Sequence, residues 1–235
     1  MADSSIEAAK PTVTKVHRTF DAAISSRLTV LLATACGLIV ANVYYSQTIA
    51  GLIAASLGLA PALTGLIVAL TQAGYGAWLL LVVPLGDLVE NRRLVLTLIG
   101  VSAVALRGSA LSTRPLPYLV SALLVGLGSV AVQVLVPYAS HMAPERARGR
   151  AVGNVMSGLM IGILIARPAS SFLTQLASWH LVYYISAGSM LALALGMKLG
   201  MPKRLGVEGV TYTTLLKSMV HLGLRTRVLQ RRALY

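Results

Sequence analysis

Six long stretches of the sequence are almost free of charged side chains, and they constrain the fold more than any other feature. They run over residues 28–49, 61–85, 94–111, 117–140, 151–173 and 181–199. Each is close to the roughly 20 residues that a helix needs to cross the hydrocarbon core of a bilayer. Only helices and closed barrels satisfy the backbone inside lipid, and these stretches lack the two-residue alternation of barrel strands. The sequence therefore predicts an all-α membrane protein with six transmembrane helices.

The composition agrees with this prediction, because 56% of the residues are hydrophobic and only 11% are charged. An ordinary soluble domain carries charge on roughly a quarter of its residues. We expect three parts: a cytoplasmic segment over residues 1–27, a six-helix bundle over 28–200, and a basic cytoplasmic linker or tail over 201–235. The first segment is too long and too polar to be the flank of a secretory signal, so the first helix should remain in the mature protein. The tail is either an amphipathic helix at the inner leaflet or a partly ordered linker.

Basic residues give the chain a net charge of +13, and most of them fall in segments that would lie on one side of the membrane. By position, 17 of the 20 lysines and arginines precede the first stretch, lie at or beyond the end of the last, or fall in the loops at Arg92 and Arg148. Basic loops stay on the cytoplasmic side, so both termini should be cytoplasmic. We expect a multi-pass protein of the cell membrane, the inner membrane in a bacterium. A nucleic-acid partner is excluded, because the segments outside the stretches are too short to form a basic binding module.

The six stretches divide into two groups of three, over residues 28–114 and 116–199, which would run in opposite directions across the membrane. Inverted repeats of this kind form many secondary transporters, whose substrate sites lie near the midplane between the repeats. We therefore expect a 3+3 inverted-repeat bundle with a central cavity.

Polar side chains inside the stretches are the candidates for lining such a cavity, because they usually face protein or water. They are Asn42 and Tyr45 in the first stretch, Gln72 and Tyr75 in the second, Gln133 in the fourth and Arg167 in the fifth. The alternative for the uncharged residues is hydrogen bonding between helices. For Arg167 the alternative is snorkelling to an interface, since the spans contain no acidic partner.

A short motif between the second and third stretches points to a family. Gly86 and Asp87 are followed by Arg92 and Arg93 in a very short basic turn. This resembles the signature loop of the major facilitator superfamily, although Leu88 stands where that family usually has a basic residue. The resemblance implies that Gly86, Asp87, Arg92 and Arg93 form a cytoplasmic gating loop. Without it, the same residues are topology-setting charges.

Two further segments, residues 41–47 and 148–153, look like the drug and metabolite efflux branch of the same family. The resemblance covers residues from the first stretch to the tail and corresponds to the N-terminal half of a twelve-helix transporter. It implies a secondary active transporter that moves a small organic solute outward, with a second six-helix half or a second copy as partner. The alternatives are a truncated or non-functional remnant, or a half that acts only as a dimer.

Enzyme chemistry finds no support in the sequence. Cys36 is the single cysteine, and the four histidines have no spacing typical of a metal site. We therefore expect no catalytic residue, no metal, no cofactor and no enzymatic activity. An ATP-binding loop is also missing, so a gradient would supply the energy for transport. Ile163 follows Gly162 where the antiporter motif of the family usually has a proline, and this departure weakens a proton-antiport assignment.

Overall fold

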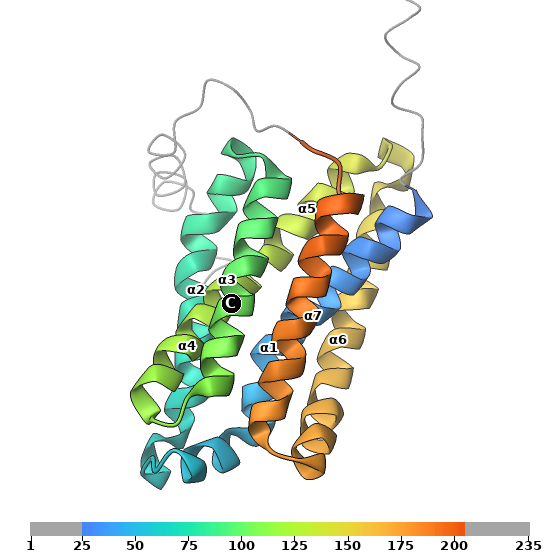
Figure 1. The fold of residues 1–235 in the computed structure, drawn as a ribbon. Coiled ribbons are helices and arrows are strands. Elements are labelled where there is room, and N and C mark those ends of the chain that lie inside the picture. The colour runs from blue at the N-terminus through green and yellow to red at the C-terminus, as the bar shows by residue number, and fades with distance from the viewer. Residues whose placement is uncertain (1–24, 205–235) are drawn as a thin grey trace, which may run out of the picture.

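The computed structural model describes residues 25–204, and nearly all of them lie in helices (Figure 1). The helices are α1 (Ser26–Ser56), α2 (Thr64–Leu88), α3 (Asn91–Leu111), α4 (Pro115–Ser129), α5 (Ala131–Met142), α6 (Arg148–Leu176) and α7 (Trp179–Gly200). Short 3-10 helices, η3 (Pro61–Leu63) and η4 (Glu145–Ala147), precede α2 and α6. The expected segment over residues 1–24 and the tail beyond residue 204 lie outside the described part.

Six candidate membrane spans are present within residues 25–204, as the sequence predicts. The fourth span is the exception in detail, because α4 and α5 together cross the membrane and the helix breaks at Val130. There the N–H of Val130 bonds to the carbonyl of Leu127 at 3.2 Å, and the N–H of Gln133 bonds to the carbonyl of Val130 at 2.9 Å. These three-residue bonds replace the four-residue bonds of an α-helix, so one predicted helix becomes two.

The tightest packing is between α1 and α6 and between α2 and α4. A Cβ atom built on Gly162 would lie 2.3 Å from the carbonyl oxygen of Gly37, and one on Gly126 would lie 2.1 Å from that of Thr71. In lipid, helices are held by such close van der Waals contact, which only small residues permit. Gly158 and Gly162 thus form the small-residue face that lets α6 approach α1.

The helix pairs follow the pattern of two inverted triplets. When the first three spans are exchanged with the last three, the pair α1 with α6 becomes the pair α4 with α2. The pair α3 with α7, which is also extensive, maps onto itself. This pairing agrees with the 3+3 bundle that the sequence predicts.

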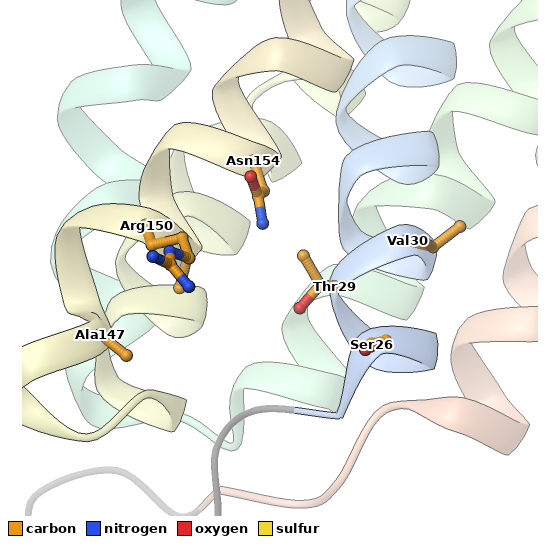
Figure 2. Close-up of a pocket in the computed structure, with 7 residues that line it drawn as sticks. Ser26, Thr29, Val30, Ala147, Arg150 and Asn154 are labelled. Carbon is orange, nitrogen blue, oxygen red and sulfur yellow. The ribbon is translucent and has the colours of Figure 1, made fainter.

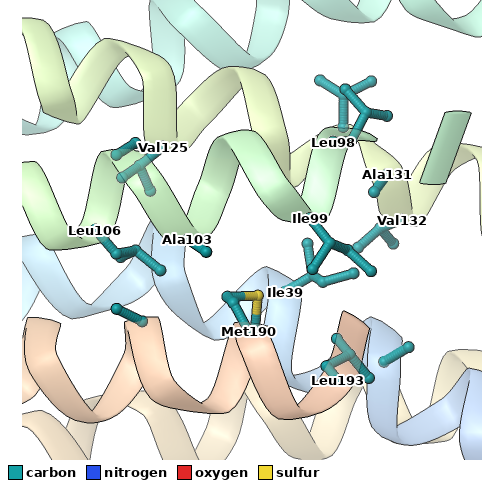
Figure 3. Close-up of a cluster of buried hydrophobic side chains, with 14 of the residues drawn as sticks. Ile39, Leu98, Ile99, Ala103, Leu106, Val125, Ala131, Val132, Met190 and Leu193 are labelled. Carbon is teal, nitrogen blue, oxygen red and sulfur yellow. The ribbon is translucent and has the colours of Figure 1, made fainter. Parts of the chain in front are cut away.

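The core lies where α1, α3, the broken fourth span and α7 meet. Figure 3 shows Ile39, Ile99, Val132 and Met190 in this cluster, and all four are 2% exposed or less. The spans formed by α2 and α6 are the least buried of the six. Large open faces are therefore concentrated on these two helices.

The start of α1 and the end of α7 lie at the same end of the bundle, together with the α2–α3 turn and the α5–α6 connection (Figure 1). The charged side chains of Arg92, Arg93, Arg146, Arg148 and Arg150 are on these segments. We call this end the basic end. Its cytoplasmic location stays a prediction.

Candidate functional site

Two of the six polar candidates meet inside the bundle. The Nε2 of Gln133 donates a hydrogen bond to the Tyr75 hydroxyl at 2.7 Å. The contact joins the first triplet to the second, because Tyr75 is on α2 and Gln133 follows the break between α4 and α5. It is possible because Gly126 brings α4 against the backbone of α2, where an added Cβ would lie 2.7 Å from the Tyr75 nitrogen. The pair therefore forms a polar bridge between the two repeats.

Asn42 lies on the inner side of α1 and is 1% exposed. Neither its Oδ1 nor its Nδ2 has a hydrogen-bond partner within residues 25–204. A buried polar group left without a partner costs about 1–3 kcal/mol. Asn42 is thus the one cavity candidate that is enclosed in the described bundle yet has unused hydrogen-bonding capacity.

Tyr45 has different neighbours from Asn42, although the two residues are three apart on α1. Its side chain is partly buried, interacts with the Ser186 hydroxyl on α7, and lines an open groove between α1 and α6. Although three-residue spacing places Asn42 and Tyr45 close along one helix, the neighbouring helices give them separate surroundings. One is enclosed, and the other opens into the groove.

Gln72 and Arg167 are both exposed on the outer faces of the bundle. Arg167 lies on α6, nine residues before its end at Leu176, which is about 14 Å along the helix axis. In the part of the chain that the structure describes, the guanidinium of Arg167 has no recorded hydrogen bond or ion pair; only its carbonyl accepts a bond, from Ser170 at 2.9 Å. An unpaired guanidinium this far inside a span is costly in lipid and needs a partner or water.

The signature turn is anchored to the end of the bundle's last helix. Arg92 Nη2 donates a hydrogen bond to the carbonyl of Lys198, and the backbone N–H of Asn91 donates one to the carbonyl of Arg204 at 3.2 Å. Gly86 lies against Val134 of α5, and a Cβ atom built on Gly86 would be in ordinary van der Waals contact with the Val134 side chain, 3.7 Å from its Cγ1. The turn thus links α2, α3, α5 and α7 at the basic end.

The other two loop candidates are less defined. Arg93 is exposed, and its carbonyl accepts a hydrogen bond from Thr97 Oγ1 at 3.0 Å. Asp87 lies in the last turn of α2, but its side chain is outside the described part. Its expected role as a gating latch therefore stays a prediction.

The sequence analysis missed Tyr138 as a partner of this turn. Its hydroxyl donates a hydrogen bond to the carbonyl of Pro202 at 2.9 Å, so α5 also holds the segment that follows α7. A tyrosine in an apolar span, near its basic end, was the available signal. Its partner is a backbone carbonyl 64 residues away, and a pattern of side chains in the sequence cannot predict such a partner.

A second missed group joins α4 to α7 at the opposite end of the bundle. The hydroxyls of Tyr118 and Tyr183 lie 2.6 Å apart, and Trp179 packs edge-on against Tyr118 with ring centroids 5.7 Å apart. Aromatic residues with polar tips are typical of the membrane interface, so this cluster fits the edge of a span. Within residues 25–204, no group of three or more histidine, cysteine, aspartate or glutamate side chains is placed to hold a metal ion.

Comparison with known proteins matches this chain to transporters. Residues 30–214 match the family model of the Major Facilitator Superfamily. The "Uncharacterized transporter YgaY" of Escherichia coli O157:H7 is 36% identical over 211 residues, which are 90% of this chain and 54% of the relative. The "Probable transporter SCO4007" of Streptomyces coelicolor is 33% identical over 153 residues, 65% of this chain and 36% of the relative.

The chain spans about half the length of the YgaY proteins that it matches. The match begins inside α1 and runs past α7, so it includes all six described spans. With most of the chain covered, the relationship does not depend on the signature turn alone. The chain belongs to the Major Facilitator Superfamily, a family of membrane transporters and not of enzymes.

Proposed function

We propose that this chain is half of a secondary active transporter that exports a small organic solute across the cell membrane. The family and the six spans support a transporter, and the relatives carry that word in their names. The outward direction and the drug and metabolite efflux branch rest on the resemblance of residues 41–47 and 148–153. The small-molecule substrate and the lipid bilayer are its expected partners.

The observation that carries the proposal is the polar bridge between Gln133 and Tyr75. Tyr75 lies near the middle of α2, and Gln133 lies just after the break in the fourth span. Secondary transporters bind substrates near the midplane, between repeats and beside broken helices. The bridge combines all three features.

The orientation of the protein forms part of the same proposal. Both ends of the chain and the loops at Arg92 and Arg148 would face the cytoplasm, because most basic residues lie there. In a bacterium the membrane would be the inner one. In this orientation the signature turn, with Gly86, Asp87, Arg92 and Arg93, is a cytoplasmic gating loop.

A second half completes the proposed transporter. The open faces of α2 and α6 and the unpaired guanidinium of Arg167 support a partner that covers them. That partner is either another six-helix half or a second copy of this chain. The alternative is a truncated or non-functional remnant, which would bind no partner and move no solute.

The test measures the accumulation of a panel of fluorescent organic solutes in cells that produce the chain. We expect at least one solute to accumulate less, and a protonophore that collapses the gradient to abolish the difference. Gln133→Leu should weaken the effect, whereas Gln175→Leu, at an exposed position near the end of α6, should not. If both variants behave like the original chain, the bridge is not part of a substrate path. If well-inserted protein changes the accumulation of no solute, a second copy of this chain does not complete a transporter. The same assay with a separate six-helix half produced beside the chain then decides between that partner and the remnant alternative.

A further inference from the structure

A cavity of about 360 Å³ opens at the basic end, between the first turns of α1 and α6, and four of its seven lining residues have polar side chains. Figure 2 shows Arg150 and Asn154 extending from α6 toward Thr29 and Ser26 on α1. Arg150 is the charged residue among the side chains that line the cavity, and none of them is acidic. The cavity therefore offers a cationic group together with hydroxyl and amide donors.

The two helix ends add to this positive character. Both α1 and α6 begin at the cavity, and neither has a side-chain hydrogen bond capping its first turn. The free N–H groups of a helix start carry partial positive charge. The guanidinium and the two helix ends thus act on the same small volume.

The cavity continues into an apolar groove of about 430 Å³ along the same two helices. Val30 and Asn154 line both spaces, so the polar mouth and the groove are connected. On α1 the groove extends from Val30 to Tyr45, which is about 22 Å at 1.5 Å per residue. This length exceeds the roughly 15 Å that one leaflet contributes to a hydrocarbon core of about 30 Å.

We propose that this cavity and groove bind one phospholipid with an anionic headgroup. Its phosphate accepts hydrogen bonds from Arg150, Asn154 and the hydroxyl of Ser26, and one acyl chain lies along the groove. Guanidinium and phosphate form strong charge-assisted bonds, and basic pockets between transmembrane helices recognise lipid headgroups in this way. The ends of membrane-spanning helices are also the depth at which lipid phosphates occur.

A third helix suits the groove less well than a lipid chain. Gly158 and Gly162, which form its floor, are already packed against the backbone of α1, with no room there for even a Cβ atom. A helix would also need an acidic residue to match Arg150. Free phosphate could accept hydrogen bonds from the donors of the cavity, but it would leave the apolar groove empty.

The experiment is native mass spectrometry of the full chain in mild detergent, titrated with dioleoyl phosphatidylglycerol or dioleoyl phosphatidylcholine. We expect a clear preference for phosphatidylglycerol. Arg150→Gln should weaken its binding about fivefold and remove the preference. Arg146→Gln, an exposed arginine of the same connection that does not line the cavity, should change neither.

The groove is tested by Ser157→Trp, which places a large side chain on its wall, with Val104→Trp as the control on an exposed face of α3. Ser157→Trp should weaken binding of both lipids, and Val104→Trp should not. A hundredfold excess of inorganic phosphate should leave bound phosphatidylglycerol in place. Circular dichroism and a single elution peak establish that each variant is folded.

Four results would overturn the proposal. Equal effects of Arg150→Gln and Arg146→Gln would show that the charge acts without a site, and unchanged binding by Ser157→Trp would remove the groove from it. Displacement by inorganic phosphate would identify a free-phosphate site. A change of oligomeric mass in Ser157→Trp would make the groove an interface between copies. None of these results bears on solute export, which the accumulation assay tests separately.

Discussion

Replacing Gly162 by alanine tests one of the close helix contacts of the bundle, the approach of α6 to α1. The added Cβ would lie 2.3 Å from the carbonyl oxygen of Gly37, about 1 Å nearer than the 3.4 Å at which ordinary contact begins. The obstacle is backbone, not the end of a flexible side chain, so α1 and α6 must move apart. Gly153, on the same helix, is the matched control because nothing lies within 4 Å of its added Cβ.

The two substitutions should have opposite signs. Alanine stabilises a helix relative to glycine by up to about 1 kcal/mol, and at Gly153 this gain stands alone. At Gly162 the same gain is set against an overpacking cost of about 1–3 kcal/mol. The separation of α1 and α6 also loses van der Waals contact, which is what holds helices together in lipid. We therefore expect Gly162→Ala to be less stable than Gly153→Ala by about 1–3 kcal/mol.

The assay is unfolding of the purified chain in mixed micelles, with increasing sodium dodecyl sulfate and helicity followed by circular dichroism. The midpoint should fall for Gly162→Ala and stay the same or rise for Gly153→Ala. Equal midpoints for the two variants would refute the close approach of α6 to α1 and, with it, the packing role of the Gly158 and Gly162 pair.

Three other predictions concern single positions. Asn42→Leu should raise the free energy of unfolding by about 1–3 kcal/mol, because it removes a buried amide without a partner; a loss of stability in the same micelle assay would reveal a partner. Tyr138→Phe should speed tryptic cleavage at the end of α7 two- to tenfold, since a hydrogen bond worth about 0.5–1.5 kcal/mol is lost, whereas the exposed Tyr184→Phe should cleave at the original rate. In a cysteine-free background, cysteine at Thr113 should react with a membrane-impermeant maleimide in intact cells, and cysteine at Arg92 should not; the reverse pattern would invert the proposed topology.

The six spans could be predicted from the sequence because lipid imposes a single requirement on each. A stretch of about 20 apolar residues has no other stable arrangement there, and charged residues mark where it stops. The boundaries were short by up to seven residues, as at the end of α1, where predicted residue 49 compares with Ser56. Residues 50–56 are small or apolar apart from Ser56 and continue that helix, so hydropathy alone does not locate its end.

The break at Val130 could not be predicted in the same way. Neither proline nor glycine stands at that position, and valine is compatible with a continuous helix. The neighbouring Ser129 bonds back to the carbonyl of Val125 at 2.8 Å and also approaches the carbonyl of Ile39 on α1. Contacts of this kind depend on how α1 packs, so they come from the tertiary structure.

The candidate site was predicted as a set of residue types and not as a set of contacts. The sequence indicated that Tyr75 and Gln133 were polar residues inside spans and would face protein or water. Only the close approach of α2 and α4 brings the Gln133 Nε2 to 2.7 Å from the Tyr75 hydroxyl. The motif located the signature turn between two spans. Its bond from Arg92 to the end of α7 joins positions 106 residues apart, and so required the fold.

The mass of the purified chain in mild detergent tests the half-transporter account most directly. Arg167 is exposed on α6, and an unpartnered arginine near the bilayer centre costs about 2.5–3.5 kcal/mol even on lenient insertion scales. Native proteins are stable by only about 5–15 kcal/mol, so the open face should be covered or the fold weakened. With the detergent subtracted, we predict the mass of a dimer, or a monomer that unfolds at low temperature. A stable monomer that moves a solute in liposomes would contradict the account.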